Sequence, residues 1–140
     1  MRNIVNKILA ILKGESSDKK RILIIESRNQ ALEYINKALN ASYELITAQN
    51  QIESLNYAKT EKFDLIVLNS KLNKERTLQL CASLRNLEES KHIPILIIAE
   101  KGDDAHVTDF YSQRIEGYFM EPFTTKEILN QVQVALNPRK

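Results

Sequence analysis

Four polar residues stand directly after apolar runs of the chain, where strands would end: Glu26, Ser27, Asn69 and Glu121. Two carboxylates that meet at one place can raise each other's pKa or share a divalent cation. We expect Glu26 and Glu121 to point into solvent instead, because two carboxylates without fixed partners make a weak metal site. The neutral amide of Asn69 adds little attraction for a cation, so the sequence predicts no metal site.

The apolar runs that precede these residues are typical of short strands: Ile22–Ile25, Leu45–Ala48, Leu65–Leu68, Ile95–Ile98 and Tyr118–Met120. The first, third and fourth runs are apolar at every position. Strands of that kind are buried under helices on both faces of a parallel sheet. We therefore expect these three runs to be the central strands.

Amphipathic stretches lie between the runs, and their expected core positions are Leu32, Ile35, Leu39, Ile52, Leu55, Leu78, Leu80, Leu84, Leu87, Val107, Phe110, Ile128, Leu129, Val132 and Leu136. Strict alternation of five strands with five helices predicts an α/β fold with a doubly wound parallel sheet and helices on both faces. Functional groups of such a sheet gather at the carboxyl ends of its strands.

Composition limits the class of protein. Apolar residues make up 43% and charged residues 27% of the 140 residues, as in an ordinary globular domain. The net charge of +2 is concentrated in residues 1–21, with six basic and two acidic side chains, so the body does not resemble a nucleic-acid binder. No apolar run is long enough to cross a bilayer. A lone Cys81 excludes a disulfide framework and fits a cytoplasmic location.

The first residues form a separate unit. Residues 3–13 have helical spacing, with Ile4, Ile8 and Leu12 on one broad apolar face. A polar stretch follows, so residues 1–20 are expected to be a helix and linker and residues 21–137 the globular domain. The apolar face of this helix could pack on the globular domain, pair with another chain or lie on a membrane surface. We favour a protein partner over lipid, because the helix is short and only modestly cationic.

Five segments together match one family pattern: Arg21–Ser27, Asp64–Leu72, Leu84–Arg85, His92–Ala99 and Gly117–Phe123. On these segments, residues 21–137 resemble the receiver domain of two-component response regulators, the CheY-like family. The resemblance implies a flavodoxin-like sheet with strand order 2-1-3-4-5.

The resemblance also implies a phosphorylation site that this chain has altered. Receivers carry an acidic pair, here Glu26 and Ser27, and a phosphate-accepting aspartate, here Asn69, which together bind magnesium. They also use a hydroxyl residue and a lysine to hold the phosphoryl group, where this chain has Ala99 and Glu121. An amide cannot form an acyl phosphate, and one carboxylate of three holds magnesium poorly. We expect no phosphorylation, no cofactor and no counter-charge at Asn69.

Two further positions follow from the same resemblance. Pro122 stands where receivers hold a cis peptide bond, so we expect that isomer here. Tyr118 matches an aromatic residue that moves inward with the switch hydroxyl. Since Ala99 has no hydroxyl, we expect Tyr118 to be static at the surface or at an interface.

An interaction face is expected on the helix around 103–113, the strand at Tyr118 and the helix Thr125–Asn137. Its apolar members are Phe110, Tyr111, Tyr118 and Val134. Scattered apolar side chains are also common on ordinary surfaces. The sequence leaves the two interpretations of this face equally open.

Three stretches, Val67–Ser70, Leu84–Ser90 and Glu100–Asp104, resemble the phosphorylation-dead receiver of two-receiver diguanylate-cyclase response regulators, which is an adaptor for dimerisation. The predicted function is accordingly a non-enzymatic adaptor, with itself or a signalling protein such as a cyclase or kinase as partner. The alternatives are a receiver that uses Ser27 or Ser70 as acceptor, and a domain that binds a small ligand or divalent cation at the strand ends.

Overall fold

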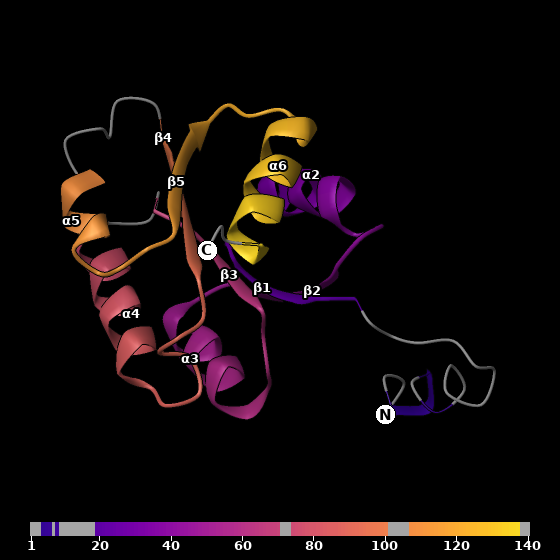
Figure 1. Cartoon of the computed structure of the whole chain (residues 1–140), viewed down its shortest axis with the longest axis horizontal. Coiled ribbons are helices and arrows are strands. Elements are labelled where there is room, and N and C mark those ends of the chain that lie inside the picture. Colours follow the sequence, from indigo (N-terminus) through magenta and orange to yellow (C-terminus); the bar gives the residue numbers. More distant parts are fainter. Residues whose placement is uncertain (1–3, 7, 9–18, 71–73, 101–106, 138–140) are drawn as a thin grey trace.

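The computed structural model describes residues 4–6, 8, 19–70, 74–100 and 107–137. Five parallel strands form a sheet in the order β2-β1-β3-β4-β5 (Figure 1). Their bounds are β1 Arg21–Ile25, β2 Glu44–Ala48, β3 Leu65–Asn69, β4 Ile95–Glu100 and β5 Gly117–Glu121. The order and the parallel pairing confirm the predicted flavodoxin-like sheet.

Helices cover both faces of this sheet. Helices α2 and α6 lie side by side on one face, and α3, α4 and α5 lie on the other (Figure 1). The helix bounds are α2 Asn29–Leu39, α3 Gln51–Thr60, α4 Lys74–Asn86, α5 Val107–Tyr111 and α6 Thr125–Leu136. The described elements are therefore three layers with the sheet in the middle.

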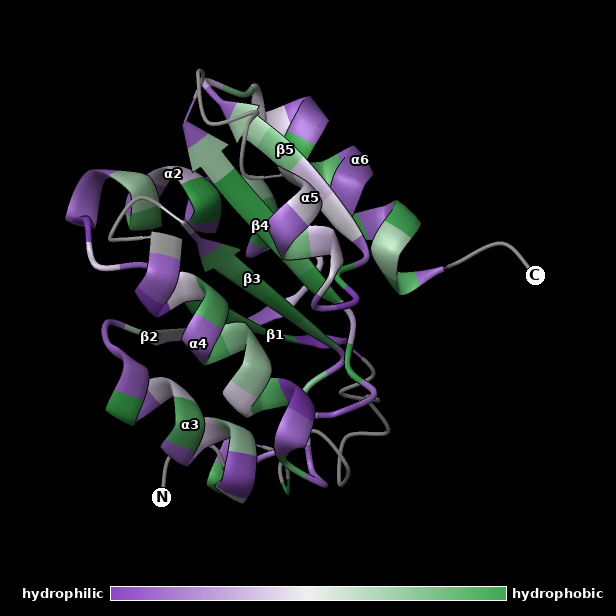
Figure 2. Cartoon of the chain, turned by 90° about the vertical axis from the view of Figure 1, so that its left-hand side faces the viewer, coloured by the Kyte–Doolittle hydropathy of each residue, from purple (hydrophilic) through white to green (hydrophobic). Residues whose placement is uncertain are grey.

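Each central strand contributes to two apolar cores. In β3, Ile66 and Leu68 pack in the core beneath α3, α4 and α5, whereas Leu65 and Val67 pack in the core beneath α2 and α6. Successive side chains of a strand point to opposite faces, so a strand covered on both sides must be apolar throughout. Figure 2 shows the apolar character of β3 and β4, which are coloured green for hydrophobic residues. Burial of such side chains contributes roughly 1.5–3 kcal/mol each.

One predicted core position is wrong. Ile52 was expected to pack in the core with Leu55, but Ile52 is 83% exposed. The buried residues of α3 are Ser54 and Ala58, which lie one helical turn apart. Ile52 precedes Ser54 by two positions and thus faces the opposite side of the helix. Small buried residues escape a pattern search that follows large apolar side chains.

The N-terminal segment carries exposed apolar side chains. Residues 4–6 and 8 are helical, in agreement with the sequence pattern. Ile4 is 64% and Ile8 is 51% exposed, and Leu12 lies outside the described residues. Within the described ranges, no helix combines the length and the apolar character that a membrane span requires.

Candidate functional site

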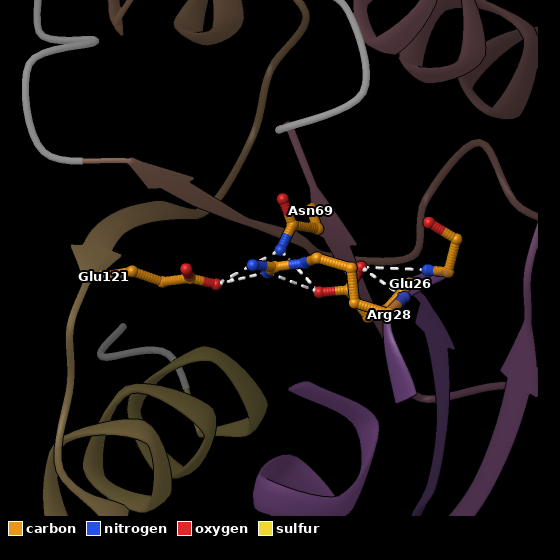
Figure 3. A network of polar contacts seen from close by, with 5 residues as sticks. Glu26, Arg28, Asn69 and Glu121 are labelled. Carbon is orange, nitrogen blue, oxygen red and sulfur yellow. Dashed lines mark hydrogen bonds and ion pairs between the residues drawn. The ribbon is translucent and has the colours of Figure 1, made fainter. Parts of the chain in front are cut away.

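The carboxyl ends of β1, β3 and β5 bring Glu26, Asn69 and Glu121 together (Figure 3). Glu26 directly follows β1, whereas Asn69 and Glu121 are the last residues of β3 and β5. Because the strands are parallel, their carboxyl ends lie at one edge of the sheet. Three of the four polar residues selected from the sequence thus form one cluster, while Ser27 beside them is exposed.

Glu26 is the centre of this cluster. Its side chain is 2% exposed, so the expectation that it points into solvent is wrong. Oε2 accepts hydrogen bonds from the backbone nitrogens of Ser27 at 2.9 Å and Arg28 at 3.3 Å. Oε1 accepts from Nδ2 of Asn69 at 2.7 Å and from Nη2 of Arg28 at 2.8 Å. Four hydrogen-bond donors therefore satisfy this buried carboxylate.

Arg28 joins the two carboxylates. Its Nη2 lies 2.8 Å from Oε1 of Glu26 and 2.7 Å from Oε1 of Glu121. Glu121 therefore also points into the cluster, and one positive charge lies between the two carboxylates. Hydrogen bonds to Glu26 and then to Glu121 raise the pKa of the Arg28 guanidinium above its ordinary value. An arginine does not lose its proton in proteins, so Arg28 is a fixed positive charge beside both carboxylates.

Arg28 was not among the site residues predicted from the sequence. It occupies the N-cap position of α2, yet its side chain makes no capping hydrogen bond. Arginine is not a preferred N-cap residue, because it has no acceptor for the free backbone N–H groups of a first turn. A basic residue two positions after Glu26, at the end of a central strand, was the signal that could have identified it.

Asn69 acts as a donor. It is 3% exposed, and Nδ2 lies 2.7 Å from Glu26 and 3.3 Å from Glu121. Oδ1 points away from both carboxylates (Figure 3). An aspartate at this position would offer no donor to Glu26 and would add a third negative charge. The amide is thus the group that fits beside a buried carboxylate.

Two further side chains and a cis peptide bond lie at the same edge of the sheet. Ala99, near the end of β4, is 1% exposed and supplies no hydroxyl group. Ser70 follows Asn69 and is 7% exposed, and its Oγ has no hydrogen-bond partner in the part of the chain that the structure describes. The peptide bond between Glu121 and Pro122 is cis, as expected from the sequence.

The expected interaction face needs one correction. Phe110 is 1% exposed and belongs to the core beneath α3, α4 and α5, so it cannot contact a partner. Tyr118 is half-buried against that core, with its ring centroid 6.4 Å from that of Phe110. Tyr111 and Val134 remain exposed, at 49% and 61%. Adjacent positions on a helix differ by about 100°, which separates Phe110 from Tyr111.

A groove opens beside the cluster. It has a volume of about 750 Å³ and is lined by Arg28, Gln30, Ala31, Tyr34, Glu100, Glu121, Pro122 and Phe123. The Tyr34 hydroxyl donates to the carbonyl oxygen of Phe123 at 2.8 Å, and the two rings are 5.6 Å apart in an edge-on arrangement. These contacts connect α2 to the turn before α6 and give the groove a defined aromatic wall.

A doubly wound five-stranded sheet with polar residues at the carboxyl ends of β1, β3 and β5 defines a receiver-like module. The chain belongs to the response regulator receiver domain family, whose model matches residues 22–133. Membership in this family places the domain in two-component signalling.

Individual relatives are distant. The alkaline phosphatase synthesis transcriptional regulatory protein PhoP of Bacillus subtilis is 30% identical, over 84% of this chain and 48% of PhoP. The polar-differentiation response regulator DivK of Brucella anthropi is 25% identical, over 81% of this chain and 94% of DivK. The structure of the chemotaxis response regulator CheY4 of Vibrio cholerae, 20% identical, has a TM-score of 0.77 over 84% of this chain and 99% of CheY4, which supports the fold alone.

The chain is short relative to several proteins that it matches. It spans about half the length of PhoP and 12% of the sensor histidine kinase TmoS of Ectopseudomonas mendocina. Receiver domains therefore occur in these proteins as one part of a longer chain.

The magnesium ion that the family implies does not fit these residues. A hard divalent cation takes about six oxygen ligands. Here a guanidinium nitrogen lies between the carboxylates of Glu26 and Glu121, and the side chain of Asn69 presents its nitrogen to them. In the described part of the chain, no three His, Cys, Asp or Glu side chains are grouped so that they could hold a metal ion.

Proposed function

We propose that this chain is a degenerate receiver domain, a non-enzymatic module that binds a protein partner independently of phosphorylation. The observation that carries this proposal is the hydrogen bond from Asn69 to Glu26, because an amide stands where an acceptor carboxylate would be needed. The proposed setting is cytoplasmic two-component or cyclic-dinucleotide signalling.

Phosphoryl transfer needs an acceptor, a cation and groups that neutralise the transferred charge. Asn69 cannot accept a phosphoryl group, and Ala99 cannot donate a hydrogen bond to one. Glu121 would repel the phosphoryl oxygens from the end of β5, where it is held by Arg28. These three features support loss of the phosphorylation reaction while the fold is retained.

Exposed apolar side chains support the adaptor role. Ile4, Val5 and Ile8 are each more than half exposed and lie on one helical segment. Such a segment is stabilised when another protein covers it. The proposed partner is a second copy of the chain or a signalling protein such as a kinase or a cyclase, and neither nucleic acid nor a membrane is required. Among the matched proteins, TmoS is a sensor histidine kinase.

Phosphorylation independence is tested with beryllofluoride, which mimics a phosphoryl group on an acceptor aspartate. We expect the amide NMR spectrum to stay unchanged during titration, because no carboxylate is present at position 69. Localised shifts around Glu26 and Asn69 would contradict the proposal.

Self-association is tested by light scattering of the full chain. We expect a dimer that becomes a monomer when Ile4 and Ile8 are both replaced by Asn, because the apolar contact is lost. Asn6→Ser, on the same helical segment, is the matched control and should remain dimeric. A wild-type monomer would exclude the homodimer and leave a different protein as the partner.

The groove beside the cluster favours a second candidate, a receiver switched by a small ligand. Its volume of about 750 Å³ lies in the range of ligand pockets, and its wall combines aromatic rings with charged groups. A ligand found by thermal-shift screening should stabilise the wild type and not Tyr34→Ala.

A non-standard acceptor is tested in parallel, since any beryllofluoride response at exposed Ser27 or buried Ser70 should vanish in the Ser→Ala variants.

A further inference from the structure

Within the proposed function of a phosphorylation-independent module, on which this inference rests, we propose that Arg28 is the permanent cation of the site. Its guanidinium takes the position that a divalent metal ion would need between Glu26 and Glu121. The Arg28 side chain therefore prevents metal binding, and its removal creates a site for a divalent cation.

The lone pairs of Glu26 show why a metal ion is excluded. A carboxylate offers about four acceptor sites. Glu26 uses four, two on Oε2 for the backbone nitrogens of Ser27 and Arg28, and two on Oε1 for Asn69 and the Arg28 guanidinium. A metal ion would have to displace at least one of these donors from a side chain that is 2% exposed.

Arg28 also supplies a positive charge between the carboxylates of Glu26 and Glu121. A single nitrogen, Nη2, contacts carboxylates from the ends of β1 and β5, so one positive charge lies where two negative charges converge. The guanidinium charge would repel a divalent ion at this position, and arginine does not lose its proton in proteins. Unlike a metal ion, this cation cannot dissociate, because it is covalently part of the chain.

The same contact connects distant parts of the sheet edge. Residues 28 and 121 are 93 positions apart, and their ion pair joins the loop after β1 to the end of β5. Tyr34 joins α2 to the turn after β5 through the Phe123 carbonyl. Arg28 therefore holds the edge in one arrangement without a bound ion.

The experiment is a Mn²⁺ titration of the full chain, followed by calorimetry and by paramagnetic broadening of amide NMR signals. We expect no localised broadening in the wild type. Arg28→Gln should broaden signals next to residues 26, 69 and 121 and bind Mn²⁺ at least about tenfold more tightly than the wild type. Arg28→Lys keeps the charge and should bind Mn²⁺ as weakly as the wild type.

Arg21→Gln is the matched control. Arg21 also contacts two glutamates, Glu44 at 3.1 Å and Glu61 at 2.6 Å, but at the opposite end of the sheet. An equal gain of Mn²⁺ affinity in Arg21→Gln would show a general charge effect and overturn the proposal. An Arg28→Gln variant that folds and binds no more Mn²⁺ than the wild type would overturn it as well.

A second variant, Asn69→Asp, keeps the proposal testable if Arg28→Gln does not fold. It adds a carboxylate while Arg28 stays in place, so it should still bind Mn²⁺ as weakly as the wild type. Tight binding by Asn69→Asp alone would overturn the role of Arg28. A beryllofluoride response of the wild type would instead refute the proposed function, so the two failures are distinguishable.

Discussion

The side-chain nitrogen of Asn69 lies 2.7 Å from Oε1 of Glu26 and donates a hydrogen bond to it. The two residues are 43 positions apart and meet because β1 and β3 are adjacent parallel strands. Both side chains are almost completely buried, at 3% and 2% exposure. The identity of residue 69 as an amide therefore bears on the stability of this edge of the sheet.

Asn69→Asp should lower the free energy of unfolding by about 1–3 kcal/mol near neutral pH, because a buried hydrogen bond is replaced by charge repulsion. The folded-state pKa of the new carboxyl would lie above its unfolded value. Its folded form then binds the proton more tightly, so the deficit relative to wild type should shrink as the pH falls toward about 4.

Urea unfolding at several pH values measures this difference. Asn56→Asp is the control, because Asn56 is exposed on α3 and makes no side-chain contact with Glu26. The same loss of stability in both variants would contradict a specific effect at the strand ends.

Arg85 should be essential for the folded state. It is 9% exposed, and its guanidinium donates hydrogen bonds to backbone carbonyls of two loops, at Ser90, Lys91, Ile93, Gln113 and Arg114. Burial lowers the pKa of Arg85. Within the described residues, the hydrogen-bond acceptors of its guanidinium are all backbone carbonyls. Arg85→Lys lacks the planar fork and should lose about 2–4 kcal/mol of unfolding free energy in urea.

Arg114→Lys is the comparison for this variant. The Arg114 side chain is exposed, and the backbone carbonyl that accepts from Arg85 is unchanged by the substitution. We expect a change within about 0.5 kcal/mol. If Arg85→Lys were equally mild, the carbonyl contacts of Arg85 would contribute little.

The start of α6 depends on a capping box. Thr124 accepts a hydrogen bond from the backbone nitrogen of Glu127 at 3.0 Å, and the Glu127 side chain accepts from the backbone nitrogen of Thr124 at 3.2 Å. Thr124→Ala should lower the unfolding free energy by about 1 kcal/mol. Thr125→Ala, at the next position, keeps the capping box and should be close to neutral. Urea unfolding of both variants and faster hydrogen exchange in the first turn of Thr124→Ala are the measurements.

Cys81 should be protected in the native protein. Its side chain is 0% exposed, and burial raises the pKa of its thiol from 9.0 to about 12. Only the thiolate reacts with a disulfide reagent, so labelling should be slow in the folded state and fast in denaturant. Rapid labelling without denaturant would show that α4 opens readily.

The same thiol predicts an alkaline effect on stability. Because the folded pKa is raised, the contribution of Cys81 is complete below pH 9.0 and is lost as the pH rises toward about 12. Wild-type unfolding free energy should fall more steeply over that range than that of Cys81→Ala. Parallel slopes in the two proteins would contradict the raised pKa.

Local pattern was sufficient for the strands and for much of the core. The runs around Ile24, Val67 and Ile97 are apolar at every position, because each strand is covered on both faces. The same reasoning failed for Ile52, because the side of α3 that packs on the sheet carries the small residues Ser54 and Ala58. Phe110 was expected both in the core and on the interaction face, and its burial confirms the core position alone.

The sequence by itself determined the sheet, the alternation of helices and strands, and the amide at position 69. Tertiary structure decided which groups that amide meets. Arg28 contacts Glu26 two positions before it and Glu121 93 positions after it, and only the folding of β1 and β5 into one sheet brings those carboxylates to a single nitrogen. No local pattern contains such a contact, because its partners come from opposite ends of the domain.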